Sequence, residues 1–240
     1  MKKILSLLLI LSFRVFADTA FDGANKLYES GKYAEAENAY LSLLKSGNKS
    51  AEVYYNLGNS YFKDKKLGLA ILNYEKALEI APRDVDIKYN LDFSGSFIKE
   101  TVIKDTASKV LNTLYYYLTL NELCVILSVC FILLLGVLIY RIYRKDELSY
   151  WLRFSLSILF GILFIFSAVR IFENENTKAA IVITASVEAK AAPIENNPAS
   201  FTIPEGKKVY ILNTRRDWVE ILLKSENMKG WIKKDTIAEI

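Results

Sequence analysis

The sequence predicts a multi-domain membrane protein with an α-helical superhelix, two transmembrane helices and a small all-β barrel. Three observations lead to this fold class. Small and aromatic residues recur with a period of 34 between residues 17 and 84. Two long runs, residues 123–140 and 154–172, are almost free of charge. From residue 179 onward, apolar and polar residues alternate in short segments, as they do in strands.

Residues 1–17 have the pattern of a cleavable signal peptide. Lys2 and Lys3 precede a short apolar stretch, and Val15-Phe16-Ala17 ends it with small side chains at the positions a signal peptidase recognises. The stretch is short for a bilayer core of ~30 Å, which favours cleavage after Ala17. The alternative is an uncleaved anchor, which would add a third span and leave the downstream topology unchanged.

Residues 18–113 are predicted to form helical repeats, with units at 17–50, 51–84 and a degenerate third unit at 85–113. The repeated residues, each pair 34 apart, are Ala24-Asn25 with Gly58-Asn59, Ala36 with Ala70, and Tyr40 with Tyr74. The unit Ala51 to Asp84 resembles the tetratricopeptide repeat (TPR) family at Tyr54, Leu57-Gly58, Tyr61, Ala70, Tyr74, Ala77 and Pro82. About three stacked units are needed to bury the helix faces, and the third unit is expected to complete the array.

The TPR resemblance implies a groove lined by the first helix of each unit, which binds extended peptides or partner helices. The implied groove residues are Asn25, Tyr28, Tyr55, Asn56, Asn59, Phe62, Lys63, Tyr89, Asn90 and Phe93. The carboxylate-clamp type is not expected, because Phe21, Asp86 and Asn90 replace its cations. Tyrosine, phenylalanine and asparagine favour amphipathic helices or extended segments as ligands. The alternative is that many of these side chains only pack or solvate a helix, with Phe93 in the core.

The two apolar runs are predicted to be transmembrane helices joined by a cytoplasmic loop at 141–153. That loop holds Arg141, Arg144, Lys145 and Arg153 against two acidic residues, so the positive-inside rule places it in the cytoplasm. Both flanking soluble regions are then extracytoplasmic. The alternative is a buried hairpin in a soluble protein. The rings near the run ends favour a membrane, as an aromatic belt of Tyr115, Tyr116, Tyr117, Tyr140, Tyr150 and Trp151.

Residues 179–240 resemble bacterial SH3-like domains in three short runs. These runs are Ile203-Pro204-Glu205-Gly206-Lys207-Lys208-Val209, Asp217-Trp218-Val219-Glu220-Ile221 and Lys229-Gly230-Trp231-Ile232. The resemblance implies binding of cell-wall peptides or protein segments, with Trp218 and Trp231 as the candidate surface. Ala192 stands where that family usually has glycine, and the alternative is that both tryptophans belong to the core.

The order of the parts resembles the TPR membrane proteins of bacterial aerotolerance operons (Bat-type, BatE-like). That resemblance implies the bacterial inner membrane and two periplasmic domains. It also implies membrane-protein partners with von Willebrand A domains, an AAA-type ATPase, and a role in aerotolerance or stress-related assembly. The main alternative is a peptidoglycan-binding protein that acts through the SH3-like tail.

Composition argues against enzymes and nucleic-acid binding. Histidine is absent, which excludes Ser-His-Asp and Cys-His catalysis. The soluble regions are close to neutral, with 13 basic and 15 acidic residues at 18–122 and 11 basic and 10 acidic at 170–240. Neither offers a basic face for phosphates. No catalytic residue, metal site or cofactor is expected, and Glu35, Glu37, Glu75 and Glu79 are expected to be solvated.

Overall fold

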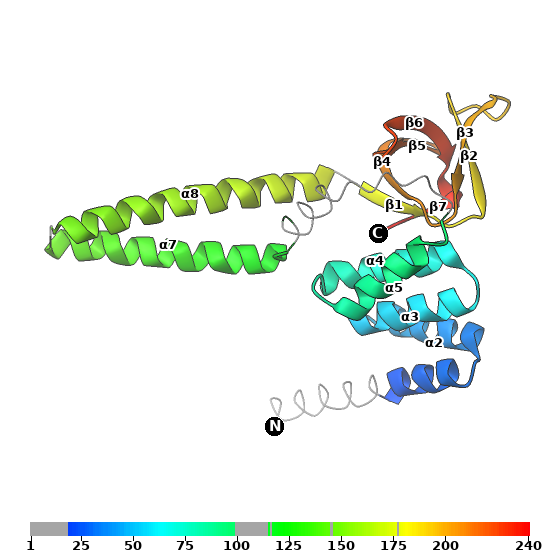
Figure 1. The fold of residues 1–240 in the computed structure, drawn as a ribbon, viewed down its shortest axis with the longest axis horizontal. Helices are drawn as coiled ribbons and strands as arrows, with labels where there is room; N and C mark the ends of the chain where they lie inside the picture. The colour runs from blue at the N-terminus through cyan, green and yellow to red at the C-terminus, as the bar shows by residue number, and fades with distance from the viewer. Residues whose placement is uncertain (1–18, 99–114, 116, 145, 177) are drawn as a thin grey trace, which may run out of the picture. The chain divides into compact units, whose positions relative to one another are not determined.

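The computed structural model describes residues 19–98, 115, 117–144, 146–176 and 178–240. The predicted signal peptide and the second half of the predicted third repeat lie outside these residues. The described chain divides into two compact units. One holds the helical repeats and the C-terminal sheet, and the other holds the pair of long helices (Figure 1).

Helical repeats form the first part of the chain. Residues 19–29 are helical and are followed by α2 (Tyr33–Lys45), α3 (Ala51–Lys63), α4 (Leu67–Ile80) and α5 (Val85–Gly95). Ser50 caps α3, because its side chain accepts a hydrogen bond from Val53 N–H, and Asp84 caps α5 through Asp86 and Ile87 N–H. Turns with positive φ at Gly31, Gly47 and Lys65 separate successive helices.

The core of the repeats uses the small and aromatic residues that the 34-residue period identifies. Ala36, Tyr40, Ala70 and Tyr74 are almost completely buried, and a Cβ added to Gly58 would lie 2.7 Å from the Tyr74 ring. The first and second helices of a unit therefore cross closely, with a ring filling the space beside the crossing.

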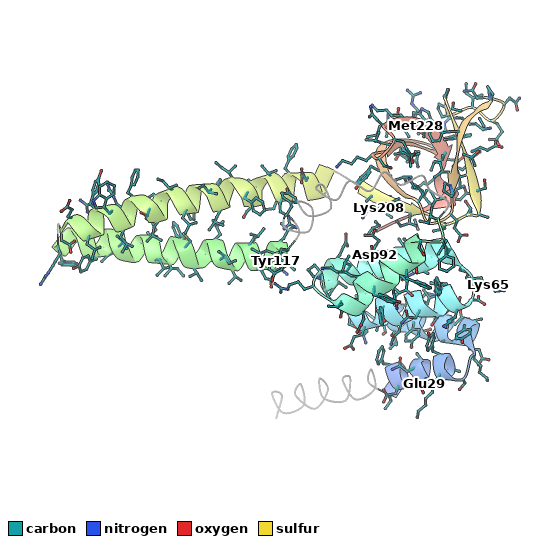
Figure 2. All side chains as sticks on the ribbon, in the orientation of Figure 1. Glu29, Lys65, Asp92, Tyr117, Lys208 and Met228 are labelled. Atoms are coloured by element: carbon teal, nitrogen blue, oxygen red, sulfur yellow. The ribbon has the colours of Figure 1, made fainter. Side chains whose placement is uncertain are left out.

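The two long helices form an antiparallel pair, α7 (Leu120–Tyr143) and α8 (Glu147–Asn176). A capping box between Thr119 and Glu122 starts α7. Both helices are long and apolar enough to cross a membrane. Only 11% of the most apolar 18-residue stretch of α7 is buried, and only 6% of that of α8. Figure 2 shows side chains projecting outward along both helices.

The helices of this pair extend beyond the predicted spans of 123–140 and 154–172. Most of the predicted 141–153 loop is helical, and only residues 144–146 separate α7 from α8. The positive charges of Arg141 and Arg153 thus sit on helix ends, where both guanidinium groups lie over the Tyr150 ring. Hydrophobicity predicted the apolar centres of the helices and missed their polar ends.

The C-terminal part is an all-antiparallel sheet, called the β-domain below. Its strands are β1 (Lys178–Val182), β2 (Ser186–Lys190), β3 (Ala199–Pro204), β4 (Lys208–Arg215), β5 (Trp218–Leu223), β6 (Met228–Lys233) and β7 (Ile237–Glu239). The strand order is β3-β2-β6-β5-β4-β1-β7, and alternate residues such as Val219, Ile221 and Leu223 face its core.

The all-β prediction is confirmed for this domain, but the sheet of the predicted small barrel is not closed. Strands β3 and β7 end the sheet on either side and share no ladder in the described residues, so the seven strands form an open, curved sheet. Strands β2 and β6 meet at a single paired position, Lys190 with Trp231, and a register shift at Ala189/Lys190 bends β2. Alternation in sequence predicts strands but not whether the sheet closes.

A third apolar cluster joins the repeats to the β-domain. Ile71 and Leu72 of α4 pack with Ile181 of β1, and all three side chains are buried. The repeats and the β-domain therefore share one continuous packed unit.

Candidate functional site

The candidate site is the surface formed by the first helices of the three units, called here the first-helix face. It comprises the nine predicted residues Asn25, Tyr28, Tyr55, Asn56, Asn59, Phe62, Lys63, Tyr89 and Asn90. Residues 19–29 supply two of them, α3 supplies five and α5 supplies two. Hydrogen bonds between Asn25 and Asn56 and between Asn59 and Asn90 connect neighbouring first helices, so the chain brings these asparagines together on successive units.

The asparagines of this face take part in a hydrogen-bonded triad between units one and two. Tyr40 Oη donates to Asn25 Oδ1 at 2.6 Å, and Asn56 Nδ2 donates to the same oxygen at 3.0 Å. One amide oxygen thereby links the second helix of its own unit to the first helix of the next. Burial raises the pKa of Tyr40 to about 12, because it penalises the phenolate.

The same triad recurs 34 residues later between units two and three. Tyr74 Oη donates to Asn59 Oδ1 at 2.7 Å, and Asn90 Nδ2 donates to that oxygen at 2.9 Å. The Asn90 amide also lies 2.9 Å from Tyr55 Oη. The four asparagines therefore hold the units in register, and much of their hydrogen-bonding capacity is used within the array.

Aromatic side chains gather at the α5 end of the face, in a group called here the aromatic cluster: Phe62, Tyr89, Phe93 and Phe97. The Phe62 ring lies 5.7 Å from both Phe93 and Phe97, and Tyr89 stacks on Phe93 at 6.3 Å. Tyr89 is 67% exposed, Phe93 45% and Phe97 56%. These rings present apolar surface to the outside, and the exposed Lys63 follows Phe62 directly in α3.

The opposite end of the face is less exposed. Tyr28 is half-buried and packs edge-on against Tyr33 at 5.4 Å. Burial, followed by the neighbouring hydroxyls of Tyr33 and Tyr55, raises the pKa of Tyr28. The face thus changes from packed tyrosines at unit one to exposed rings at unit three.

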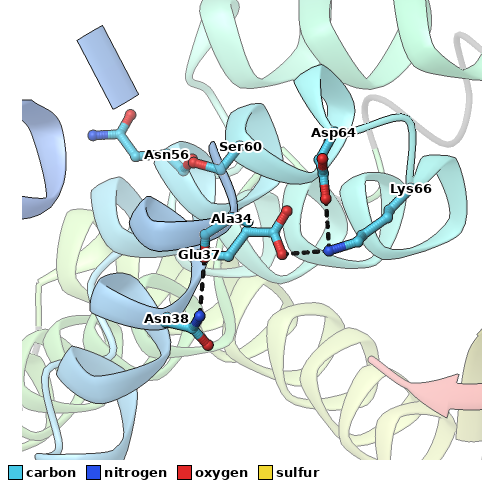
Figure 3. Close-up of polar contacts among 7 residues, drawn as sticks. All are labelled: Ala34, Glu37, Asn38, Asn56, Ser60, Asp64 and Lys66. Carbon is cyan, nitrogen blue, oxygen red and sulfur yellow. Dashed lines mark hydrogen bonds and ion pairs between the residues drawn. The ribbon is translucent and has the colours of Figure 1, made fainter. Parts of the chain in front are cut away.

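A buried carboxylate, Glu37, lies between the first two units. Lys66 Nζ is 2.7 Å from Glu37 Oε2 and 2.7 Å from Asp64 Oδ2 (Figure 3). Burial raises the pKa of Glu37, and the Lys66 ammonium opposes that shift. The expectation of solvated carboxylates is wrong for Glu37, which is 5% exposed, and for Glu75, which pairs with Lys208. Both have structural ion-pair partners.

The two tryptophans of the β-domain have different surroundings. Trp231 is 9% exposed and belongs to the packed interior. Trp218 is half-buried, with Lys233 Nζ 4.5 Å and Lys190 Nζ 5.6 Å from its ring. A hollow of about 340 Å³ in this domain is lined by other residues, among them Lys178, Ile211 and Lys234. Trp218 is the better placed of the two for a ligand.

Sequence reasoning missed two sets of residues. Phe97 completes the aromatic cluster but is not among the predicted groove residues. Gly68, Ile71 and Glu75 of α4 contact the β-domain. The sequence does carry a signal for the second set. Helix α4 has apolar residues on opposite sides, and a helix of this kind packs against other elements on each side.

Comparisons with known proteins support the repeats. The tetratricopeptide repeat family matches residues 51–84, and a second TPR repeat family matches residues 24–65. A search of curated proteins found no match. A solved structure, NlpC2 from Trichomonas vaginalis, aligns with 20% identity over 27% of this chain and 25% of its own, with a TM-score of 0.24. The chain thus contains TPR repeats, a repeat type that suggests a scaffold for protein interactions.

Proposed function

We propose that this protein is a membrane-anchored scaffold that binds other proteins through the first-helix face of its TPR repeats. The observation that carries the proposal is the aromatic cluster, in which Tyr89, Phe93 and Phe97 are each more than 40% exposed on a repeat type that suggests protein binding. Exposed, clustered rings supply large contact area for a partner at low entropic cost.

The chemistry of this face favours an apolar or amphipathic partner segment. The asparagines already hydrogen-bond within the array, so main-chain capture by amides contributes less than contact with rings. An amphipathic helix that presents residues at i, i+3 and i+4 fits such a surface. Membrane tethering would raise the effective concentration of a weak partner in the same bilayer.

We also propose the location and the setting of this scaffold. The lipid-compatible surfaces of α7 and α8 support a membrane anchor, and the charge bias of residues 141–153 supports a cytoplasmic turn. Packing of α4 against β1 supports placing both soluble parts on one side, which we take to be periplasmic. The partners proposed from the aerotolerance-operon resemblance are von Willebrand A-domain membrane proteins. No catalytic activity and no cofactor are proposed.

The test is partner recovery from native membranes after cross-linking of the full chain, followed by mass spectrometry. The variant Tyr89→Ser/Phe93→Ser removes two exposed rings, and we expect recovery of the specific partners to fall about tenfold, as for loss of a binding hot spot. Circular dichroism and hydrogen exchange of α3 and α4 verify that the repeats remain folded.

The matched control is Ile194→Ser/Leu212→Ser, which removes two exposed apolar side chains from the β-domain. This control should recover partners like the natural sequence. Unchanged recovery by the Tyr89/Phe93 variant would remove the basis of the proposal.

Cell-wall binding through the β-domain is the second candidate function, and Trp218 between two lysines favours it. Sedimentation of the detergent-solubilised full chain with purified peptidoglycan tests it, with Trp218→Ala as the variant. Binding that is lost with Trp218→Ala and kept with the Tyr89/Phe93 variant would select this function.

A further inference from the structure

Helix α4 differs from its neighbours in how it begins. Ser50 caps α3 and Asp84 caps α5 with their own side chains, whereas Lys66 at the start of α4 makes no side-chain capping bond. The first amides of a helix have no acceptor within the helix itself. Helix α4, like α2 at Lys32, therefore has no capping side chain of its own at its start.

The acceptor at the start of α4 comes from the β-domain. Gly68 N–H donates to Glu205 Oε1 at 2.7 Å, across 137 residues of sequence. Glu205 lies in the turn between β3 and β4, and its carboxylate also suits the positive end of the α4 dipole. Glu205 of the β-domain thus caps the first turn of α4, as Ser50 and Asp84 cap the helices that directly follow them.

Glycines make this approach possible. A Cβ added to Gly68 would lie 2.5 Å from Val182 O and 2.8 Å from Ile183 Cα, so backbone of the β-domain occupies that space. Gly206 has a φ of +83°, and a Cβ there would meet Ile71 Cδ1 at 2.7 Å. Two glycines 138 positions apart therefore give the two surfaces their close fit.

Apolar and ionic contacts extend the same surface. Ile71, Leu72 and Ile181 are 3%, 6% and 0% exposed. Further along α4, Glu75 Oε2 lies 2.9 Å from Lys208 Nζ. This side of α4 faces away from the Ala70, Tyr74 and Ala77 side that forms the repeat core, because helical periodicity places the two sets on opposite sides.

We propose that the β-domain is an integral cap of the TPR array. It docks on α4 through Glu205, Lys208 and the buried side chains of Ile71, Leu72 and Ile181. The repeats and the tail then act as one rigid body although the α7–α8 segment separates them in sequence. The outer side of α4 is consequently closed to other proteins, while the first-helix face stays open to partners.

Carbodiimide cross-linking of the full chain in native membranes tests the docking directly. The reagent joins a carboxylate and an amine that touch, so an amide between Glu75 and Lys208 is expected within one chain. The matched control is the Glu37–Lys66 pair, with a separation of 2.7 Å against 2.9 Å and a similar lysine exposure. Formation of the control link without the Glu75–Lys208 link would overturn the proposal.

Hydrogen exchange gives the second measurement. Glu205→Ala should speed exchange of the first α4 amides about fivefold, the effect of losing a helix cap, and Glu205→Gln, which keeps an acceptor oxygen but loses the charge, should speed it less. Glu188→Gln, an exposed carboxylate on β2, should leave them unchanged. Charge reversal by Glu75→Lys or Lys208→Glu should also raise exchange, and the double reversal should restore it. Equal α4 exchange in all variants would contradict the docking. Neither measurement depends on partner recovery, so the scaffold proposal is tested separately.

Discussion

At the scale of single residues, one hydrogen-bonded triad joins the repeats and occurs twice. Asn25 Oδ1 and Asn59 Oδ1 each accept two bonds, one from a tyrosine of the second helix and one from an asparagine of the next unit. The period of 34 thus repeats a polar connection as well as a packing pattern. Residues of this kind stabilise the face rather than select its ligand.

Asn59→Leu is expected to lower the free energy of unfolding of the repeats by about 2 kcal/mol, because Tyr74 Oη and Asn90 Nδ2 both lose an acceptor. Denaturant unfolding of the full chain in detergent, followed by circular dichroism, measures it. Asn38→Leu is the control, since Asn38 is exposed and bonds only to Ala34 O among the described contacts. Tyr74→Phe should cost less in the Asn59→Leu background, and full additivity would argue against the triad.

Alkaline pH should destabilise the repeats through Tyr40. Its pKa is raised from 10.0 to about 12 by burial, so the folded state holds the phenolic proton more tightly than the unfolded state. This contribution is complete below pH 10 and is lost between pH 10 and about 12. One proton changes the free energy of unfolding by about 1.4 kcal/mol per pH unit. Tyr40→Phe should give a shallower decline than Tyr89→Phe, and identical slopes would contradict the assignment.

At the scale of elements, the helices differ in whether a neighbouring residue or a distant one caps their first turn. Helices α3, α5 and α7 carry Ser50, Asp84 and Thr119 at their starts, each accepting hydrogen bonds from the first turn. Helix α4 relies on Glu205 instead. Local sequence therefore fixes three of these four helix starts, and tertiary contact fixes the fourth.

Asp84→Ala should weaken α5 without affecting α3. The Asp84 carboxylate accepts from Asp86 N–H at 2.9 Å and from Ile87 N–H at 3.1 Å, and loss of such a cap costs about 1 kcal/mol. Site-resolved hydrogen exchange should show α5 amides about fivefold faster. Asp22→Ala, at an exposed site in the first helical stretch, is the control. Faster exchange spread over all helices would point to global unfolding instead.

At the scale of the whole molecule, sequence periodicity predicted the repeats because each helix pair buries residues at fixed local spacing, as at Ala70 and Tyr74. The length of the two apolar runs predicted the long helices, because this signal too is contained in consecutive residues. Sheet closure and the packing of Ile71 on Ile181 depend on contacts between distant segments, which local patterns do not encode. The TPR pattern predicted the positions of the asparagines, whereas the hydrogen bonds between them are seen only in the folded structure.

Docking of the β-domain on α4 constrains how the chain can cross a bilayer. Residues 67–98 and 178–240 pack together, so a segment that crosses between them must return to the side it left. Reporter fusions at the Gly47 turn and after Ile240 should therefore report the same compartment, and a reporter at residues 144–146 the opposite one.

In the topology proposed above, the positive charges of residues 141–153 place the turn between α7 and α8 in the cytoplasm. Replacing Arg141, Arg144 and Arg153 with glutamine should weaken this preference and produce mixed orientation, yet both termini of the α7–α8 pair should still share one side in every molecule. Fusions at Gly47 and Ile240 that report different compartments would contradict both the membrane hairpin and the rigid body, because the Ile71–Ile181 contact cannot form across a bilayer.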